Sequence, residues 1–185
     1  MPVQIGATTH SFNDPTGLLS DCHRRVEMFM GSLQAVAAVC DQPLTDHVRR
    51  ALDLALRYFR EAAPKHTADE EESLFPRLRR IDNAELRVAL AHLDALEEDH
   101  RWAEPLHQIV DLIGNEFLVN GELTPAKCSD FREAVSQLAA MYRRHIDIED
   151  KQVFPVAAKI VSAELKVEIA REMAARRAVK QVVSL

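Results

Sequence analysis

Apolar residues recur every three or four positions along most of this chain, which is the spacing of an α-helix that buries one face. The first stripe follows Asp14-Pro15, a capping residue and a proline of the kind that suits a first helical turn. It predicts a helix over residues 15–40. His23 lies in register with the apolar positions of this helix, which are Leu19, Val26, Met30, Leu33 and Ala37.

A second stripe starts after Pro43 and runs to Leu74. Its apolar face also includes His66 and Glu70, one helical turn apart. Pro64 should bend this helix just before them, because proline removes a backbone donor and crowds the preceding turn.

Two long stripes and a short one complete the chain. The third begins after Asp82-Asn83, includes His100 and ends near residue 120. The fourth runs from residue 125 to about residue 161 and carries His145 and Glu149 on its apolar face. A shorter fifth helix is expected over residues 163–179. We predict an all-α protein, since only five of the 185 residues are Gly while Ala, Leu, Arg and Glu are abundant.

Charge and chain ends argue against several kinds of partner. The net charge is -6, and one basic cluster, from Arg171 to Lys180, lies on a predicted helix, so nucleic acid is not an expected partner. Met1 to His10 lacks the regions of a signal peptide, and no apolar run reaches the roughly 18 residues that span a bilayer. We therefore expect a cytoplasmic protein with no membrane partner.

The cysteines support the same compartment. Cys22, Cys40 and Cys128 are an odd number without paired spacing, which argues against a disulfide framework and suits a reducing environment. Their expected role is packing, although Cys22, next to His23, has the alternative of a redox-sensitive thiol.

One motif occurs twice. His66 and Glu70 are followed by Phe75-Pro76, and His145 and Glu149 by Phe154-Pro155, so both copies read H-x3-E-x4-F-P. A single earlier His precedes each copy, His23 by 43 residues and His100 by 45. Four helices therefore carry a duplicated set of side chains with metal-ligand chemistry.

Helical geometry explains why these residues suit a metal. Residues four apart lie on one face about 6 Å apart along the axis, so an H-x3-E pair can converge on one centre. Buried carboxylates and imidazoles are costly unless something compensates them, and a cation does so. The candidate metal ligands are His23, His66, Glu70, His100, His145 and Glu149.

Other polar residues have plainer interpretations. Any single inward His is more often a hydrogen-bonded core residue than a ligand. Glu27 and Glu104, four residues after His23 and His100, are expected on a solvated face, with a hydrogen bond to an imidazole as the alternative. The acidic run from Asp69 to Glu72 is expected to be solvated apart from Glu70, and His107 has the phase to line a pocket.

The whole pattern resembles the hemerythrin-like, or HHE cation-binding, family. This resemblance implies an up-down-up-down four-helix bundle over residues 14–161, followed by a C-terminal helical segment, 162–185, that packs on it. It also implies two iron ions with an oxo or hydroxo bridge, in preference to manganese. Glu70 and Glu149 would be the bridging carboxylates and the four His the terminal ligands. Oxygen-carrying members have a further His where this chain has Glu104, so an open position is expected on both irons.

The leading functional hypothesis is a di-iron protein that binds or senses O2, NO or iron and redox state, served by an electron donor that the sequence does not identify. The alternative is a di-iron enzyme of nitrosative or oxidative stress defence, acting in iron-centre repair, NO reduction or peroxide decomposition. The repair proteins resemble a longer architecture with an additional Cys-containing domain, which weakens that version. A third possibility is a helical interaction module without metal.

Overall fold

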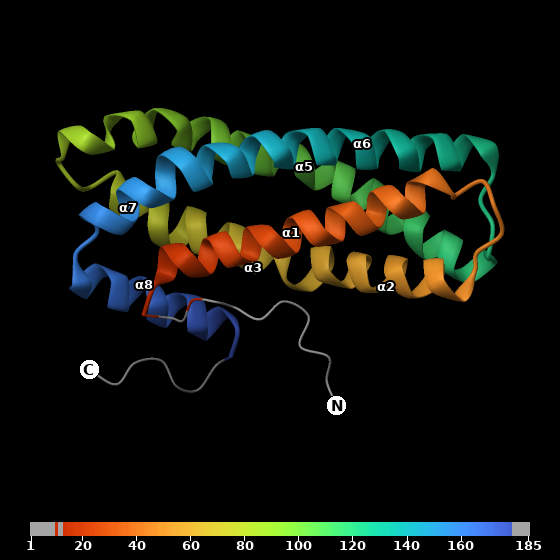
Figure 1. The fold of residues 1–185 in the computed structure, drawn as a ribbon, viewed down its shortest axis with the longest axis horizontal. Helices are drawn as coiled ribbons and strands as arrows, with labels where there is room; N and C mark the ends of the chain where they lie inside the picture. The colour runs from red at the N-terminus through yellow and green to blue at the C-terminus, as the bar shows by residue number, and fades with distance from the viewer. Residues whose placement is uncertain (1–9, 11–12, 179–185) are drawn as a thin grey trace. The chain divides into compact units, whose positions relative to one another are not determined.

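The computed structural model describes His10 and residues 13–178. The expectation about a signal peptide in Met1 to His10 therefore falls almost wholly outside the described residues, as does the end of the predicted segment 162–185. The described residues form helices and no strand, which confirms the all-α prediction. Figure 1 shows these elements in chain order: α1 (Pro15–Ala38), α2 (Asp46–Glu61), α3 (Ala63–Ala68), η1 (Asp69–Leu74), α4 (Phe75–Leu78), η2 (Ala84–Leu86), α5 (Arg87–Asn120), α6 (Pro125–Ile148), η3 (Glu149–Val153), α7 (Phe154–Ile160) and α8 (Ala163–Arg176).

The chain divides into two compact units, and α1, α5 and α6 contribute residues to both. The first unit consists of Met1–Arg25, Lys65–Glu97 and Ile146–Leu185, and the second of Val26–Pro64 and Glu98–His145.

In the second unit, four helical segments close a ring. The rings of Phe29 on α1 and Tyr58 on α2 stack with their centroids 4.4 Å apart, and Phe59 on α2 lies 4.8 Å from the ring of His107 on α5. His107 Nε2 is 2.8 Å from the hydroxyl oxygen of Tyr142 on α6. The side chain of Arg132 on α6 donates to the carbonyl of Ala37 on α1, which completes the ring. This unit is a four-helix bundle.

The backbone connections of this unit show the helix directions. Leu44, just before α2, donates to the carbonyl of Gly121, just after α5, so the start of α2 and the end of α5 lie together. Cys40, after the end of α1, lies beside Cys128 near the start of α6. Successive helices therefore run in opposite directions, as the up-down-up-down prediction requires.

Cys40 and Cys128 form a disulfide, with Cα atoms 5.7 Å apart. The prediction that these two cysteines pack without forming a disulfide was wrong. Spacing along the chain could not reveal this pair, because its members are 88 residues apart and meet only through the antiparallel arrangement of α1 and α6. The cysteines thus give no support to a reducing compartment. Cys22 is outside the disulfide and is buried, as predicted.

The first unit has a core of apolar side chains from all its segments. Leu19 of α1, Leu93 of α5 and Phe75 of α4 are fully buried, and Ile169 and Met173 of α8 are 1% exposed within the same cluster. The predicted short C-terminal helix is therefore present and packed on its neighbours. It ends at Arg176, short of the predicted residue 179, and the left-handed backbone that follows, φ 54° at residue 178, is typical of a helix end.

Proline accounts for the breaks in the helices. α2 ends at Glu61 and α3 begins at Ala63, so the helix that was predicted to bend at Pro64 is interrupted just before this residue. The described part of the chain also contains two π-helical turns that we did not predict, η1 and η3.

Both π-turns occupy the same place in the duplicated motif. The N–H of Phe75 donates to the carbonyl of Glu70, and that of Phe154 donates to the carbonyl of Glu149, five residues back in each case. The proline after each Phe has no N–H for a regular helical bond and would crowd the preceding turn, which the wider turn relieves. The repeated Phe-Pro was the available signal. None of the described helices is long and apolar enough to cross a membrane.

Candidate metal centre

Four predicted ligands meet inside the first unit. His23 on α1, His66 on α3, Glu70 on η1 and Glu149 on η3 each offer one nitrogen or oxygen, and these atoms lie within 4.8 Å of one another. All four residues are buried. Their meeting requires three separate segments of chain, which the apolar core of the unit holds in place.

The imidazoles point at the carboxylates. His23 Nε2 is 3.1 Å from Glu149 Oε2 and 3.9 Å from Glu70 Oε1, and His66 Nε2 is 3.2 Å from the same oxygen of Glu70. The two imidazole rings pack edge to face with centroids 4.9 Å apart, and the His23 ring stacks on Phe154 at 5.2 Å. The Phe of the second motif copy thus forms one wall of the site.

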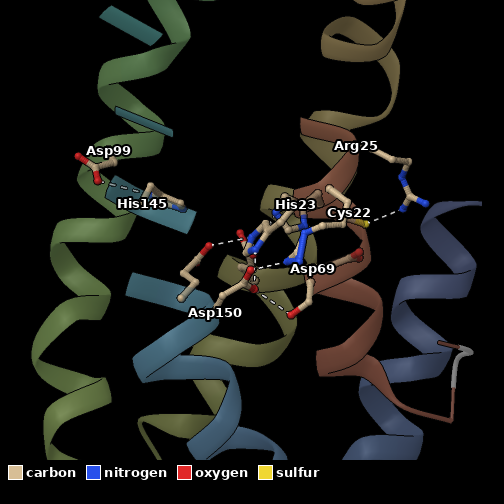
Figure 2. A network of polar contacts seen from close by, with 12 residues as sticks. Cys22, His23, Arg25, Asp69, Asp99, His145 and Asp150 are labelled. Atoms are coloured by element: carbon tan, nitrogen blue, oxygen red, sulfur yellow. Dashed lines mark hydrogen bonds and ion pairs between the residues drawn. The ribbon is translucent and has the colours of Figure 1, made fainter. Parts of the chain in front are cut away.

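Asp150 orients His23 (Figure 2). Its Oδ1 lies 2.9 Å from His23 Nδ1 and accepts a 2.8 Å hydrogen bond from Ser20, while its other oxygen pairs with Arg24. Burial lowers the pKa of His23, but Asp150 and Glu149 raise it by more, so the net shift is upward. A carboxylate on Nδ1 leaves Nε2 directed at the cluster, as for metal-bound histidines.

Glu70 is a strongly perturbed acid within this cluster. Burial, followed by the neighbouring charge of Glu149, raises its pKa well above the usual value for glutamate. Two carboxylates this close in a protein interior repel each other and lack water, and a cation between them would remove both penalties. Oxygen and imidazole donors together suit iron or manganese better than thiolate-preferring metals. The residues present therefore fit a metal ion.

The second unit holds the two remaining candidates. The rings of His100 on α5 and His145 on α6 have centroids 4.6 Å apart, and His145 is buried while His100 is half-buried. Asp99 Oδ2 lies 3.4 Å from His145 Nδ1 (Figure 2). Asp99 also pairs with Arg144. Burial raises the pKa of Asp99, but His145 and Arg144 lower it by more. His145 thus has a carboxylate on the same nitrogen as His23.

Three aspartates have roles that their positions in the sequence did not predict. Asp150 and Asp99 each adjoin a predicted ligand in the sequence, yet each supports a histidine on another helix, so helical register gave no sign of it. Asp69 was predicted to be solvated, and that was wrong. Asp69 is fully buried, because Arg176 and Arg177 of α8 bind its carboxylate.

The other polar candidates lie elsewhere. Glu27 and Glu104 are exposed, as expected, and Glu104 accepts a 2.9 Å hydrogen bond from Gln108. His107 lines a cleft of about 390 Å³ in the second unit with Phe59, and burial lowers its pKa to about 4.

The fold and the buried His and Glu cluster define a metal-binding helical bundle. Residues 14–157 match the hemerythrin HHE cation-binding domain, and the chain belongs to this family. A protein of Haemophilus influenzae described as uncharacterized is 27% identical over 173 residues, which cover 92% of this chain and 94% of that protein.

Proposed function

We propose that this hemerythrin-type domain is a non-haem di-iron protein that binds or senses O2, NO or iron and redox state. The observation that carries the proposal is the buried group of His23, His66, Glu70 and Glu149, whose donor atoms lie within 4.8 Å of one another.

The proposed ligand set adds His100 and His145 to these four. It is supported by the duplicated motif, by the family match and by the shared arrangement of His23 and His145, each with a carboxylate on Nδ1. Glu70 and Glu149 would bridge two irons, joined further by an oxo or hydroxo bridge, and the histidines would complete each coordination sphere. A bound iron pair supplies two-electron redox chemistry and positions for a small ligand.

Burial and neighbouring side chains would prepare the proposed ligands for the metal. Burial of both Glu side chains excludes water from the carboxylates and strengthens their attraction for a cation. Asp150 holds His23, and Asp99 holds His145, in a fixed orientation. Glu104, exposed and bonded to Gln108, offers no additional ligand, which favours reaction with a small molecule over stable O2 carriage.

Metal analysis tests the iron assignment. After anaerobic reconstitution with ferrous iron, the full chain should hold close to two irons. Glu70→Ala and Glu149→Ala should each lose most of them, whereas Asp147→Ala, at an exposed neighbouring carboxylate, should not. One iron or fewer in the wild type, or a clear preference for zinc, would contradict the proposal.

Rapid-mixing absorption spectra then identify the activity. A reversible spectral change on adding O2 or NO to the reduced protein supports binding or sensing. Repeated consumption of NO or peroxide by a catalytic amount of protein would instead establish the enzyme alternative.

A further inference from the structure

Helix α8 follows the family match, which ends at residue 157, yet it contacts the turn that carries Glu70. All the residues involved belong to the first unit. The contact is ionic: two consecutive arginines at the end of α8 bind one buried aspartate of η1.

That aspartate is Asp69, the residue before Glu70 (Figure 2). Arg176 Nη1 donates to Asp69 Oδ1 at 2.9 Å, and Arg177 Nη2 donates to Asp69 Oδ2 at 2.5 Å. Asp69 is 0% exposed, so both oxygens are occupied in a site that water does not reach. Arg176 also binds two later residues of η1, Ser73 and Glu72, both at 2.9 Å.

The second motif copy lacks this arrangement. Ile148 stands before Glu149, where Asp69 stands before Glu70, and it packs against the apolar core. The ion pairs on η1 therefore come from α8, whereas an ion pair on η3 joins Asp150 to Arg24 of α1. The duplication in the sequence does not explain this difference.

We propose that Asp69 is a positioning residue for Glu70, and that α8 acts through Asp69 as a clamp on η1. The inference rests on the proposed function in taking Glu70 as a metal ligand. Without the arginines, Asp69 would be a buried charge with no counter-ion, and η1 would have to open to hydrate it. Opening would displace Glu70, whose backbone is continuous with that of Asp69.

Hydrogen–deuterium exchange of the metal-free full chain tests the clamp. Replacing Arg176 and Arg177 together by Gln should speed amide exchange at least tenfold over residues 69–75 and leave residues 149–154 unchanged. Arg171→Gln, an exposed arginine on the same helix, is the matched control and should change neither. Equal changes in both turns, or none in the first, would overturn the proposal.

A triple variant tests whether the two arginines act on η1 through Asp69. Adding Asp69→Asn to the double Arg variant removes the uncompensated charge and should slow exchange at least threefold toward the wild-type rate. Failure of this rescue would mean that the arginines act through Glu72 or Ser73, and the proposal would be wrong. If the double variant does not fold, Arg177→Gln alone should show the same selective opening, at least threefold.

Iron release tests the link to the site. With the chain loaded anaerobically with ferrous iron and challenged with a ferrous chelator, the double Arg variant should release iron at least tenfold faster than Arg171→Gln. Unchanged release would overturn the positioning role. A wild-type protein that binds no iron would sink the proposed function, while the exchange experiment would still decide whether α8 clamps η1.

Discussion

Two buried histidines each have a carboxylate on Nδ1, contributed by a different helix. His23 faces Asp150 at 2.9 Å in the first unit, and His145 faces Asp99 at 3.4 Å in the second. Such a carboxylate fixes the orientation of the ring and makes the other nitrogen a better metal donor. The side chains that orient the histidines of the proposed site are therefore separate from its proposed ligands.

Asp150→Asn should weaken iron binding about 10- to 100-fold, because the amide keeps the shape but loses the charge that supports His23. The melting temperature of the metal-free protein should change little by comparison. Titration with ferrous iron under anaerobic conditions measures the affinity, with Asp147→Asn as an exposed control. Equal affinity in the two variants would show that Asp150 does not act on the metal.

His107 should make the fold sensitive to acid. Its pKa is about 4 in the folded protein, because burial opposes its charge, against about 6.5 when unfolded. Between these pH values the unfolded chain binds a proton that the folded chain does not. The contribution of His107 to the free energy of unfolding is therefore complete above pH 6.5 and is lost as the pH falls toward 4. The loss is at most about 3 kcal/mol.

His107→Gln keeps a partner for Tyr142 and removes this titration. Urea unfolding at pH 7.5, 6, 5 and 4.5 should show a smaller loss of stability on acidification than the wild type. If the free energies of unfolding of the two proteins fell in parallel with pH, His107 would remain accessible to protons in the folded protein.

Helical register predicted which polar side chains face inward, because it depends only on spacing within one helix. His23, His66, Glu70, His145 and Glu149 are all buried as their phase required, and His100 is half-buried. Asp150 could not be found this way, since its partner His23 is 127 residues distant. Local patterns do not record which helices pack together.

At the scale of the helices, each π-turn contains one residue more than a regular α-helical turn. A π-turn is an α-helix with one extra residue, so the flanking segments keep their register if that residue is removed. η1 and η3 place this extra residue directly after the glutamate of each motif copy, between Glu70 or Glu149 and the following Phe. A helical pattern with 3.6 residues per turn throughout contains no sign of these inserted residues.

Deleting Lys151, an exposed residue of η3, should convert the turn to regular helix. Far-UV circular dichroism and the melting temperature of the metal-free protein should change little, while iron binding should fall at least tenfold because Glu149 belongs to the turn that the deletion rebuilds. Deleting exposed Glu133 in regular helix is the control. It rotates all later residues of α6 by about 100° and should unfold the protein. If both deletions lowered the melting temperature of the metal-free protein equally, η3 would not be a one-residue insertion that can be removed without unfolding the helix.

At the scale of the whole molecule, the two motif copies do not form two domains. The first unit contains His66 and Glu70 from one copy together with Glu149 from the other. The resemblance in sequence predicted the bundle, and the second unit has the expected antiparallel order. The cysteine spacing misled because the Cys40–Cys128 pair depends on that tertiary order.

The disulfide should stabilise the fold. A cross-link between residues 88 positions apart typically contributes about 2–4 kcal/mol, mainly by restricting the unfolded chain. Cys40→Ser with Cys128→Ser should lower the melting temperature by about 5–15 °C. Reductant should lower that of the wild type similarly, whereas Cys22→Ser should respond to reductant as the wild type does. A wild-type melting temperature indifferent to reductant would show that the bond is absent in solution.

The raised pKa of Glu70 implies that the pocket exchanges a proton for a metal ion. Burial and Glu149 keep this carboxyl protonated at pH values where an exposed glutamate is ionised. The metal-free fold therefore loses stability as pH rises through that range, and an arriving cation must expel the proton. Iron uptake should acidify its surroundings and tighten as pH rises. Calorimetric titration in two buffers with different heats of ionisation measures the number of protons released, and a value of zero would mean that Glu70 is already ionised before the metal binds.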